Sequence, residues 1–159
     1  MQLTRFTDIG LRVVMRLVTA PADTTLTSRD LAAELAVPYT HVAKVVSRLS
    51  ELGVIHSRRG RSGGIAVTEL GRTAQAGWLA SKLEGDGEVV DCDGPQPCPL
   101  RGNCKLRGAL AQAQRAFYDS LDAHTIDELA SSSARITLLS IGTPTRTTAS
   151  GTEDAAGIR

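Results

Sequence analysis

The chain has 159 residues, a formal net charge of +1 at neutral pH and only 3% aromatic residues. That length fits one domain of ordinary size, or a small domain with an extension. No apolar run approaches the roughly 18 residues of a membrane-spanning helix, and nothing at the N-terminus resembles a secretion signal, so we expect a soluble, cytoplasmic protein with no membrane partner.

Two helices are predicted in the first 36 residues. Apolar residues recur at three- and four-residue steps between Ile9 and Val18, and they predict a first helix with Thr7 as its N-cap and Asp8 in its first turn. The run Thr27-Ser28-Arg29-Asp30 resembles a capping box in which aspartate replaces the usual glutamate or glutamine. It predicts the start of a second helix.

A third helix, from Tyr39 to Leu52, is predicted after a short turn. We expect Pro38 at its first position and Gly53 just beyond its end. Two short helices joined by a tight turn, the second polar and basic on its outer face, are typical of a helix-turn-helix. Taken alone, the pattern also fits an ordinary helical hairpin with a solvated face. The residues expected to face DNA are Tyr39, Thr40, His41, Lys44 and Arg48, the last of them nearer phosphate.

Two strand-like runs, Val54–Ser57 and Ile65–Thr68, flank the loop Arg58-Arg-Gly-Arg-Ser-Gly-Gly64. Glycine allows a sharp reversal and a close approach to a phosphate backbone, and the arginines supply phosphate or minor-groove contacts. A helix-turn-helix followed by a basic hairpin is a winged helix, so these residues favour DNA binding over the plain helical hairpin. The loop residues expected to contact DNA are Arg58, Arg59 and Arg61.

The fold class that follows is mainly α-helical with a small β-hairpin. Residues 1–84 are expected to form a winged helix-turn-helix DNA-binding domain, whose last helix is capped by Thr68 and runs to Glu84. Residues 85–105 form a loop, and residues 106–130 hold a long helix and a short one capped by Thr125. Ile136–Ile141 is a strand or a surface segment, and the Thr-, Gly-, Ser- and Pro-rich residues 142–159 are expected to be disordered.

The long helix has an apolar stripe at four- and three-residue steps. Such a stripe is either core or a dimerisation surface. A palindromic operator needs a two-fold symmetric reader, so we expect a homodimer. The residues of the stripe are Leu106, Leu110, Ala113, Phe117 and Leu121.

The loop before that helix holds all three cysteines of the chain, Cys92, Cys98 and Cys104, with five residues between each pair. Prolines and glycines forbid a regular helix or central strand there, so the backbone is irregular but locally stiff. An odd count of cysteines argues against a disulfide framework. Thiolates select zinc, copper(I) or iron–sulfur clusters, and the spacing is not the paired arrangement usual for structural zinc. These residues favour an iron–sulfur cluster over zinc and over incidental buried thiols.

Four segments resemble the nitric-oxide-sensing repressors of the NsrR type, within a family of dimeric winged-helix iron–sulfur regulators that also includes IscR. They are Met-x-Leu-Thr-x-Phe-Thr-Asp8, Val37-Pro38-Tyr39-Thr40-His41, the arginine and glycine loop ending at Gly64, and Cys92-Asp-x-x-x-x-Cys98-Pro-Leu-Arg-Gly-x-Cys104. The resemblance covers Met1 to about Leu129, and the cysteine segment is its most specific part.

The resemblance implies that Cys92, Cys98 and Cys104 bind a [4Fe-4S] cluster whose fourth ligand is Asp8 of the partner subunit. Asp8 also suits the start of a helix, where it can pair with Arg12 one turn on. By resemblance, the protein is a repressor that releases double-stranded operator DNA when nitric oxide attacks the cluster, and the released genes include functions of nitric-oxide detoxification.

Three rival interpretations differ in chemistry. One is a regulator of redox or iron–sulfur status with a [2Fe-2S] cluster in the same loop, and another is a zinc- or thiol-based sensor on the same fold. The third is an enzyme, which the sequence disfavours because it shows no phosphate loop and no nucleophile paired with a base. The histidines have no metal-ligand spacing either; they are His41, His56 and His124.

Overall fold

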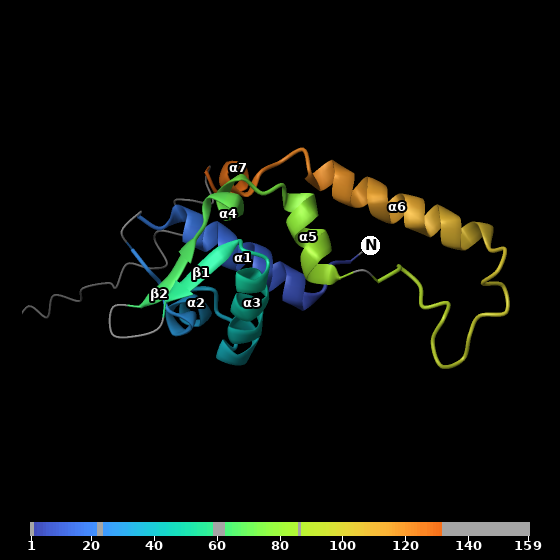
Figure 1. Ribbon diagram of the computed structural model, residues 1–159, viewed down its shortest axis with the longest axis horizontal. Coiled ribbons are helices and arrows are strands. Elements are labelled where there is room, and N and C mark those ends of the chain that lie inside the picture. The colour runs from blue at the N-terminus through green and yellow to red at the C-terminus, as the bar shows by residue number, and fades with distance from the viewer. Residues whose placement is uncertain (1, 22–23, 59–62, 86, 132–159) are drawn as a thin grey trace, which may run out of the picture.

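The computed structural model describes residues 2–21, 24–58, 63–85 and 87–131 (Figure 1). It is mainly helical with one antiparallel hairpin, as the sequence predicts. In chain order the elements are α1 (Arg5–Thr19), α2 (Ser28–Glu34), α3 (Tyr39–Glu51), β1 (Ile55–Arg58), β2 (Gly64–Val67), α4 (Glu69–Thr73), α5 (Ala76–Glu84), α6 (Lys105–Leu121) and α7 (Ile126–Ala130).

Helix α1 is the centre of the core, because it packs against α3, α5 and α7. Its apolar side chains Ile9, Val13 and Val14 are almost completely buried. The N-cap prediction is wrong, since the cap is Thr4, whose hydroxyl accepts a hydrogen bond from the backbone N–H of Thr7 at 3.3 Å. Thr7 itself lies inside the helix and is fully buried. The N-cap therefore lies three residues before the predicted one, and the buried face of α1 begins at Thr7 rather than at Ile9.

Helices α2 and α3 form the predicted helix-turn-helix. Thr27 and Asp30 make a reciprocal capping box, so the predicted start of α2 at Ser28 is confirmed. The turn after α2 places Ala36 in the left-handed region, with φ +52°. Pro38 is the N-cap of α3 in an extended conformation, and not its first helical residue as predicted. A proline suits that position because the cap's own N–H has no partner in the helix.

The two strands pair in register from Ile55 opposite Val67 to Arg58 opposite Gly64. The hairpin is therefore the wing that the sequence predicts after the helix-turn-helix. An isolated bridge between Leu26 and Ile65 ties β2 to the segment before α2. The wing and the helix-turn-helix are thus joined through the backbone as well as through side chains.

The segment from Thr68 to Glu84 is two helices rather than the predicted one. Thr68 does cap α4, but the chain becomes extended at Ala74 and Gln75 before α5 begins. The backbone of this break pairs with the residues before α7: Ala76 N–H donates to His124 O at 2.9 Å, and Ile126 N–H donates to Ala74 O at 3.0 Å. The backbone N–H and C=O groups at this break, which a continuous helix would bond internally, are thus hydrogen-bonded to a segment far along the chain.

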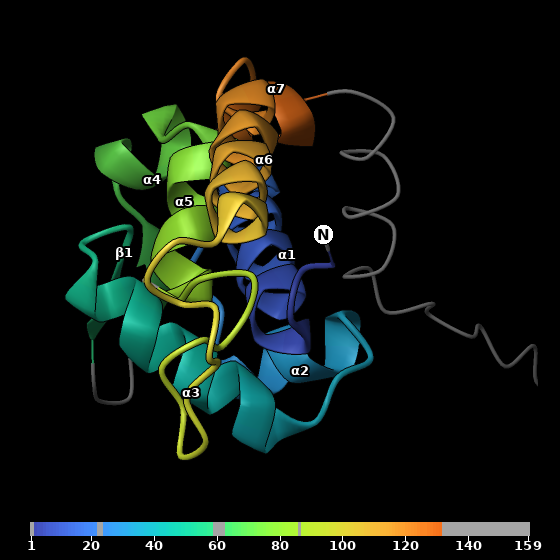
Figure 2. The same ribbon diagram turned by 90° about the vertical axis from the view of Figure 1, so that its right-hand side faces the viewer.

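Helix α6 lies against α5 and extends beyond the rest of the molecule, with the cysteine loop at its outer end (Figure 1). In the view turned by 90°, α6 is seen nearly end-on beside α5 (Figure 2). None of the residues of α6 is buried. Helix α7 returns to the core, where Ile126 is fully buried and Thr125 caps the helix as predicted. The segments predicted over 136–141 and 142–159 lie outside the described residues.

Candidate metal centre and nucleic-acid interface

The cysteine loop is irregular throughout its described part, as its prolines and glycines predict. Cys98 N–H donates to Cys92 O at 3.1 Å, which closes a turn between the first two cysteines. Cys104 is the N-cap of α6, and its Sγ accepts a hydrogen bond from the backbone N–H of Arg107 at 3.4 Å. All three thiols are free and half-buried. The loop therefore presents three soft sulfur donors within one turn-rich segment.

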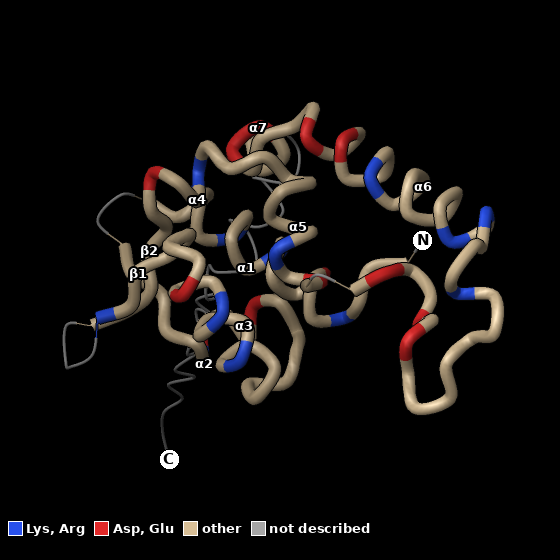
Figure 3. The backbone as a smooth tube through the Cα atoms, turned by 45° about the vertical axis from the view of Figure 1, so that its right-hand side comes forward, with Lys and Arg blue, Asp and Glu red and all other residues tan. Residues whose placement is uncertain are grey.

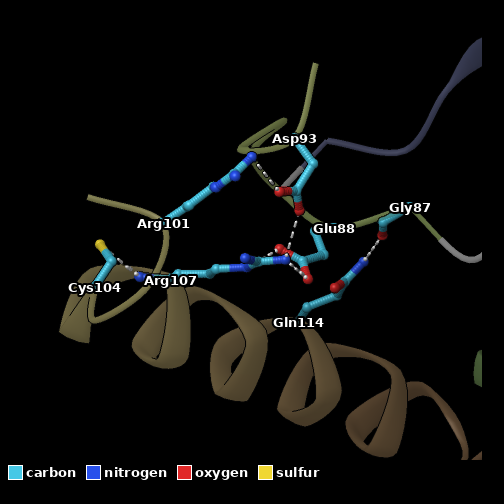
Figure 4. A network of polar contacts seen from close by, with 7 residues as sticks. All are labelled: Gly87, Glu88, Asp93, Arg101, Cys104, Arg107 and Gln114. Carbon is cyan, nitrogen blue, oxygen red and sulfur yellow. Dashed lines mark hydrogen bonds and ion pairs between the residues drawn. The ribbon is translucent and has the colours of Figure 1, made fainter. Parts of the chain in front are cut away.

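Arg107 is the centre of a polar network that the sequence analysis did not single out (Figure 4). Its Nε and Nη2 bind the two carboxylate oxygens of Glu88 at 2.6 and 2.7 Å. Nη2 also donates to Asp93 at 3.1 Å, and Arg101 reaches the same carboxylate at 3.7 Å. One guanidinium on α6 thus holds the acidic segment that leads into Cys92.

This network changes the local electrostatics. The hydrogen bonds from Arg107 lower the pKa of Glu88 below its usual value, and the two carboxylates raise the pKa of the Arg107 guanidinium. The pKa of the Cys92 thiol is raised, mainly by its loss of solvent, while the positive charge of Arg107 acts in the opposite direction. A positive charge near the thiols favours their thiolate forms.

The predicted ligands are not gathered around one point. In the part of the chain that the structure describes, no group of three or more His, Cys, Asp or Glu side chains lies close enough to hold a metal ion. Asp8 lies on α1, where its carboxylate pairs with Arg12 Nε at 2.8 Å. The donor chemistry nevertheless fits a thiolate-bound cluster, because three free thiols share a short loop, one of them at a helix N-terminus where negative charge is stabilised.

The outer face of α3 is polar and accessible at its N-terminal end. Tyr39 is 51% exposed, Thr40 and Lys44 are exposed, and His41 is half-buried. Arg48 lies farther along the helix, where it pairs with Glu51 at 3.2 Å and donates to the carbonyl of Lys82 at 3.3 Å. These bonds tie α3 to the end of α5. The accessible end of α3 is therefore the part that suits a major groove.

Lys and Arg lie on α3 and at the end of β1, and others lie along α6 and in the loop before it (Figure 3). Arg58 is exposed at the end of β1. Arg59 and Arg61, which were also predicted to contact DNA, lie outside the described residues. The three histidines are spread over different elements: His41 on α3, His56 exposed on β1, and His124 exposed in the turn before α7.

Comparison with known proteins gives the family. A family model named Rrf2 and described as "Iron-dependent Transcriptional regulator" matches residues 3–132. The chain belongs to the Rrf2 family. Rrf2 proteins are transcriptional regulators and not enzymes, so the sequence-based exclusion of an enzyme is confirmed.

Curated relatives agree with the resemblance drawn from the sequence. The chain is 54% identical over 130 residues to the HTH-type transcriptional repressor NsrR of Streptomyces coelicolor, covering 81% of this chain and 88% of that one. It is 34% identical over 131 residues to the HTH-type transcriptional regulator NsrR of Geobacillus kaustophilus, covering 81% and 89%. The predicted resemblance to NsrR-type repressors is confirmed, and with it a role for this Rrf2 protein as a DNA-binding transcriptional repressor.

Solved structures confirm the winged-helix fold of the Rrf2 family. CymR, the global cysteine regulator of B. subtilis, matches with a TM-score of 0.62 at 22% identity, over 82% of this chain and 97% of that one. IscR of T. potens matches with a TM-score of 0.62 at 14% identity, over 81% and 85%. Among the described residues, no helix is long and apolar enough to cross a membrane.

Proposed function

We propose that this chain is a nitric-oxide-responsive repressor that holds an iron–sulfur cluster through Cys92, Cys98 and Cys104. The observation that carries the proposal is the set of three free thiols in one loop at the start of α6, in an Rrf2 protein whose relatives include the repressor NsrR at 54% identity. The description of the family as iron-dependent supports the same chemistry. Soft thiolates are the usual protein ligands of such clusters.

The cluster proposed is [4Fe-4S], with Asp8 of the partner subunit as the fourth ligand; [2Fe-2S] is the alternative. When bound, the cluster supplies iron atoms that react with nitric oxide. A carboxylate is a harder and weaker ligand for such iron than a thiolate is. The ion pair between Asp8 and Arg12 in this structure supports a role for Arg12 as the resting partner of Asp8 whenever that carboxylate is not a ligand.

The chain's own residues connect ligand binding to DNA. Asp8 lies in the first turn of α1, and α1 packs directly against the recognition helix α3. A tether on Asp8 from the other subunit would fix the two α3 helices of a dimer at a spacing suited to a palindromic operator. Each tenfold loss of operator affinity needs only about 1.4 kcal/mol of differential stabilisation, so release of one carboxylate can be sufficient.

The dimer is supported by the uncovered side of α6. Leu106 is 65% exposed, and farther along the helix a groove of about 500 Å³ is lined mainly by apolar side chains. The lining includes Val89, Leu110, Ala113 and Phe117. A second copy of α6 would bury this apolar surface.

The test is anaerobic purification followed by absorption spectroscopy, iron and sulfide counts, and operator binding during titration with nitric oxide. We expect a brown protein with about four irons and four sulfides per chain, and loss of operator binding together with the visible absorbance. Cys98→Ser should abolish the absorbance, and Asp8→Ala should make it less stable, whereas Asp127→Ala, an exposed aspartate on α7, should change neither.

Two other results would overturn the proposal in different ways. About half that iron, with operator binding insensitive to nitric oxide, would support the [2Fe-2S] regulator of redox or iron–sulfur status. A colourless protein that has been kept from oxygen, especially one that holds zinc, would exclude the cluster and leave a winged-helix repressor with a different signal.

A further inference from the structure

The cysteine loop is attached to the rest of the chain at few points. Among the described residues, the only hydrogen bonds from residues 87–93 to a regular element go to α6. Gln114 Nε2 donates to the carbonyl of Gly87 at 3.0 Å, and the remaining bonds are those of Arg107 to Glu88 and Asp93. The hydrogen bonds that hold this segment over α6 therefore come from two side chains that lie two turns apart on one helix (Figure 4).

Arg107 is the stronger of these two attachments. Both oxygens of Glu88 are bound by the planar fork of the guanidinium, at 2.6 and 2.7 Å. Bidentate, charge-assisted pairs of this kind are stronger and more specific in direction than single neutral hydrogen bonds. The side chain of Arg107 is only 29% exposed, so solvent weakens the network less than it would weaken a fully exposed pair.

Arg107 also lies between the two sides of the cysteine loop. Glu88 and Asp93 flank Cys92 in the sequence, and the side chain of Arg107 binds both. Its backbone N–H donates to the sulfur of Cys104, the last cysteine. A single residue thus contacts the segment around the first cysteine and the sulfur of the third.

The segment that leads into the cysteines is strongly acidic. Every charged residue from Glu84 to Asp93 is acidic, and three thiolates would add further negative charge beside them. Like charges held close together repel one another. The guanidinium of Arg107 binds the carboxylates of Glu88 and Asp93 and so offsets part of this repulsion.

We infer that Arg107 is a positioning residue, which clamps the acidic segment against α6 and keeps a fixed positive charge beside the cysteines. The clamp is a property of the chain itself. Its effect on the cluster rests on the function proposed above. Lysine at this position would keep the charge but not the fork, so the two parts of the role can be separated.

The clamp is tested on cluster-free protein by thermolysin cleavage at the exposed apolar residues of the loop, Val90 and Leu100. We expect Arg107→Gln to speed cleavage about tenfold, because the variant loses the bidentate, charge-assisted hydrogen bonds to Glu88. Glu88→Gln should act in the same direction, and the double variant should be no faster than Arg107→Gln alone. Arg115→Gln, on the same helix but with no hydrogen bond to the described residues, is the matched control.

The charge is tested on cluster-containing protein by the reduction potential and by the rate of cluster loss to a chelator. Arg107→Gln should make the potential more negative and speed the loss, because net charge near a cluster sets its potential. Arg107→Lys should restore the potential but leave cleavage of the loop faster than in the wild type. A merely structural defect would not separate these two readouts.

Wild-type cleavage rates and an unchanged potential in Arg107→Gln would overturn the inference. If the wild-type protein carries no cluster, the proposed function fails, while the cleavage experiment still decides whether the clamp exists. If the cluster forms and the clamp variants behave as the wild type does, only the role of Arg107 is wrong.

Discussion

Ala36 shows how one residue sets the geometry of the helix-turn-helix. It lies between α2 and α3 with φ +52°, a conformation that costs an L-residue roughly 1–2 kcal/mol. The turn is nevertheless closed by hydrogen bonds on both sides, from Ala36 N–H to Ala33 O at 3.2 Å and from Val37 N–H to Ala32 O at 3.0 Å. The surrounding structure therefore holds Ala36 in a conformation that glycine would adopt without strain.

We predict that Ala36→Gly stabilises the protein. Relief of the left-handed strain outweighs the added flexibility of the unfolded chain, which leaves a net gain of roughly 0.5–1 kcal/mol. Urea unfolding followed by circular dichroism measures the change. The control is Ala33→Gly, an exposed helical position of α2, which should lose about 1 kcal/mol. A loss of equal size in both variants would show that the turn at Ala36 carries no strain.

Single residues are also where prediction from sequence is weakest. Thr4 and Thr7 are both good N-caps, and only the burial of Thr7 in the folded chain shows which of them caps α1. Arg107 resembles any other surface arginine until the acidic segment folds onto α6. Arg107 follows Cys104 by three positions and stands opposite an acidic run, and this is the one sequence signal that points to their contact.

At the scale of elements, the two capping boxes give helix starts that sequence does predict. In α2 the Thr27 hydroxyl and backbone N–H both donate to Asp30, and these bonds lower the pKa of Asp30 from its ordinary value of 3.8. The ionised carboxylate is therefore favoured in the folded state. A lowered pKa gives stability that is present above the unfolded pKa and is lost as the pH falls through the folded pKa.

We predict that Asp30→Asn lowers the free energy of unfolding by about 0.5–1 kcal/mol at neutral pH. The difference from the wild type should begin to shrink as the pH falls below the ordinary pKa of 3.8, because the carboxyl of the unfolded chain then takes up a proton. It should be lost once the pH falls through the lowered pKa of the folded state. Chemical unfolding at pH 7, 5 and 3 measures it. Asp119→Asn, an exposed change on α6, serves as the control. A difference that stays constant over this range would mean that the ionised form contributes nothing.

The break between α4 and α5 shows what local sequence does not contain. No glycine or proline interrupts residues 69–76 except Gly71 within α4, so local propensities alone favour one helix there. The chain becomes extended because its backbone pairs with the segment before α7, about fifty residues later. Such pairing is a tertiary effect, which helical periodicity cannot reveal.

At the scale of the whole molecule, the proposed site is incomplete within one chain. The three thiols lie at the outer end of α6, while Asp8 lies on α1 and is paired with Arg12. The resemblance to NsrR-type repressors anticipates this separation, because it assigns the fourth ligand to the partner subunit. The sequence alone indicates which atoms are the ligands, the cysteine sulfurs, and which loop carries them. How these sulfurs and the carboxylate of Asp8 come together depends on how two chains associate.

Association through α6 is therefore the central prediction for the assembled protein. We expect Leu110→Glu to give a monomer in sedimentation velocity, because it places a charge in the apolar groove along α6. Operator affinity should fall at least a hundredfold in the same variant, since a single recognition helix reads only one half-site. Gln112→Glu adds the same charge at an exposed position of α6 and should remain dimeric.

Unchanged circular dichroism in both variants would confirm that the effect is on association and not on folding. If Leu110→Glu stays dimeric, the dimer interface lies elsewhere than along α6. Asp8 of one subunit would then have to reach the cysteine loop of its partner by an arrangement other than the one proposed.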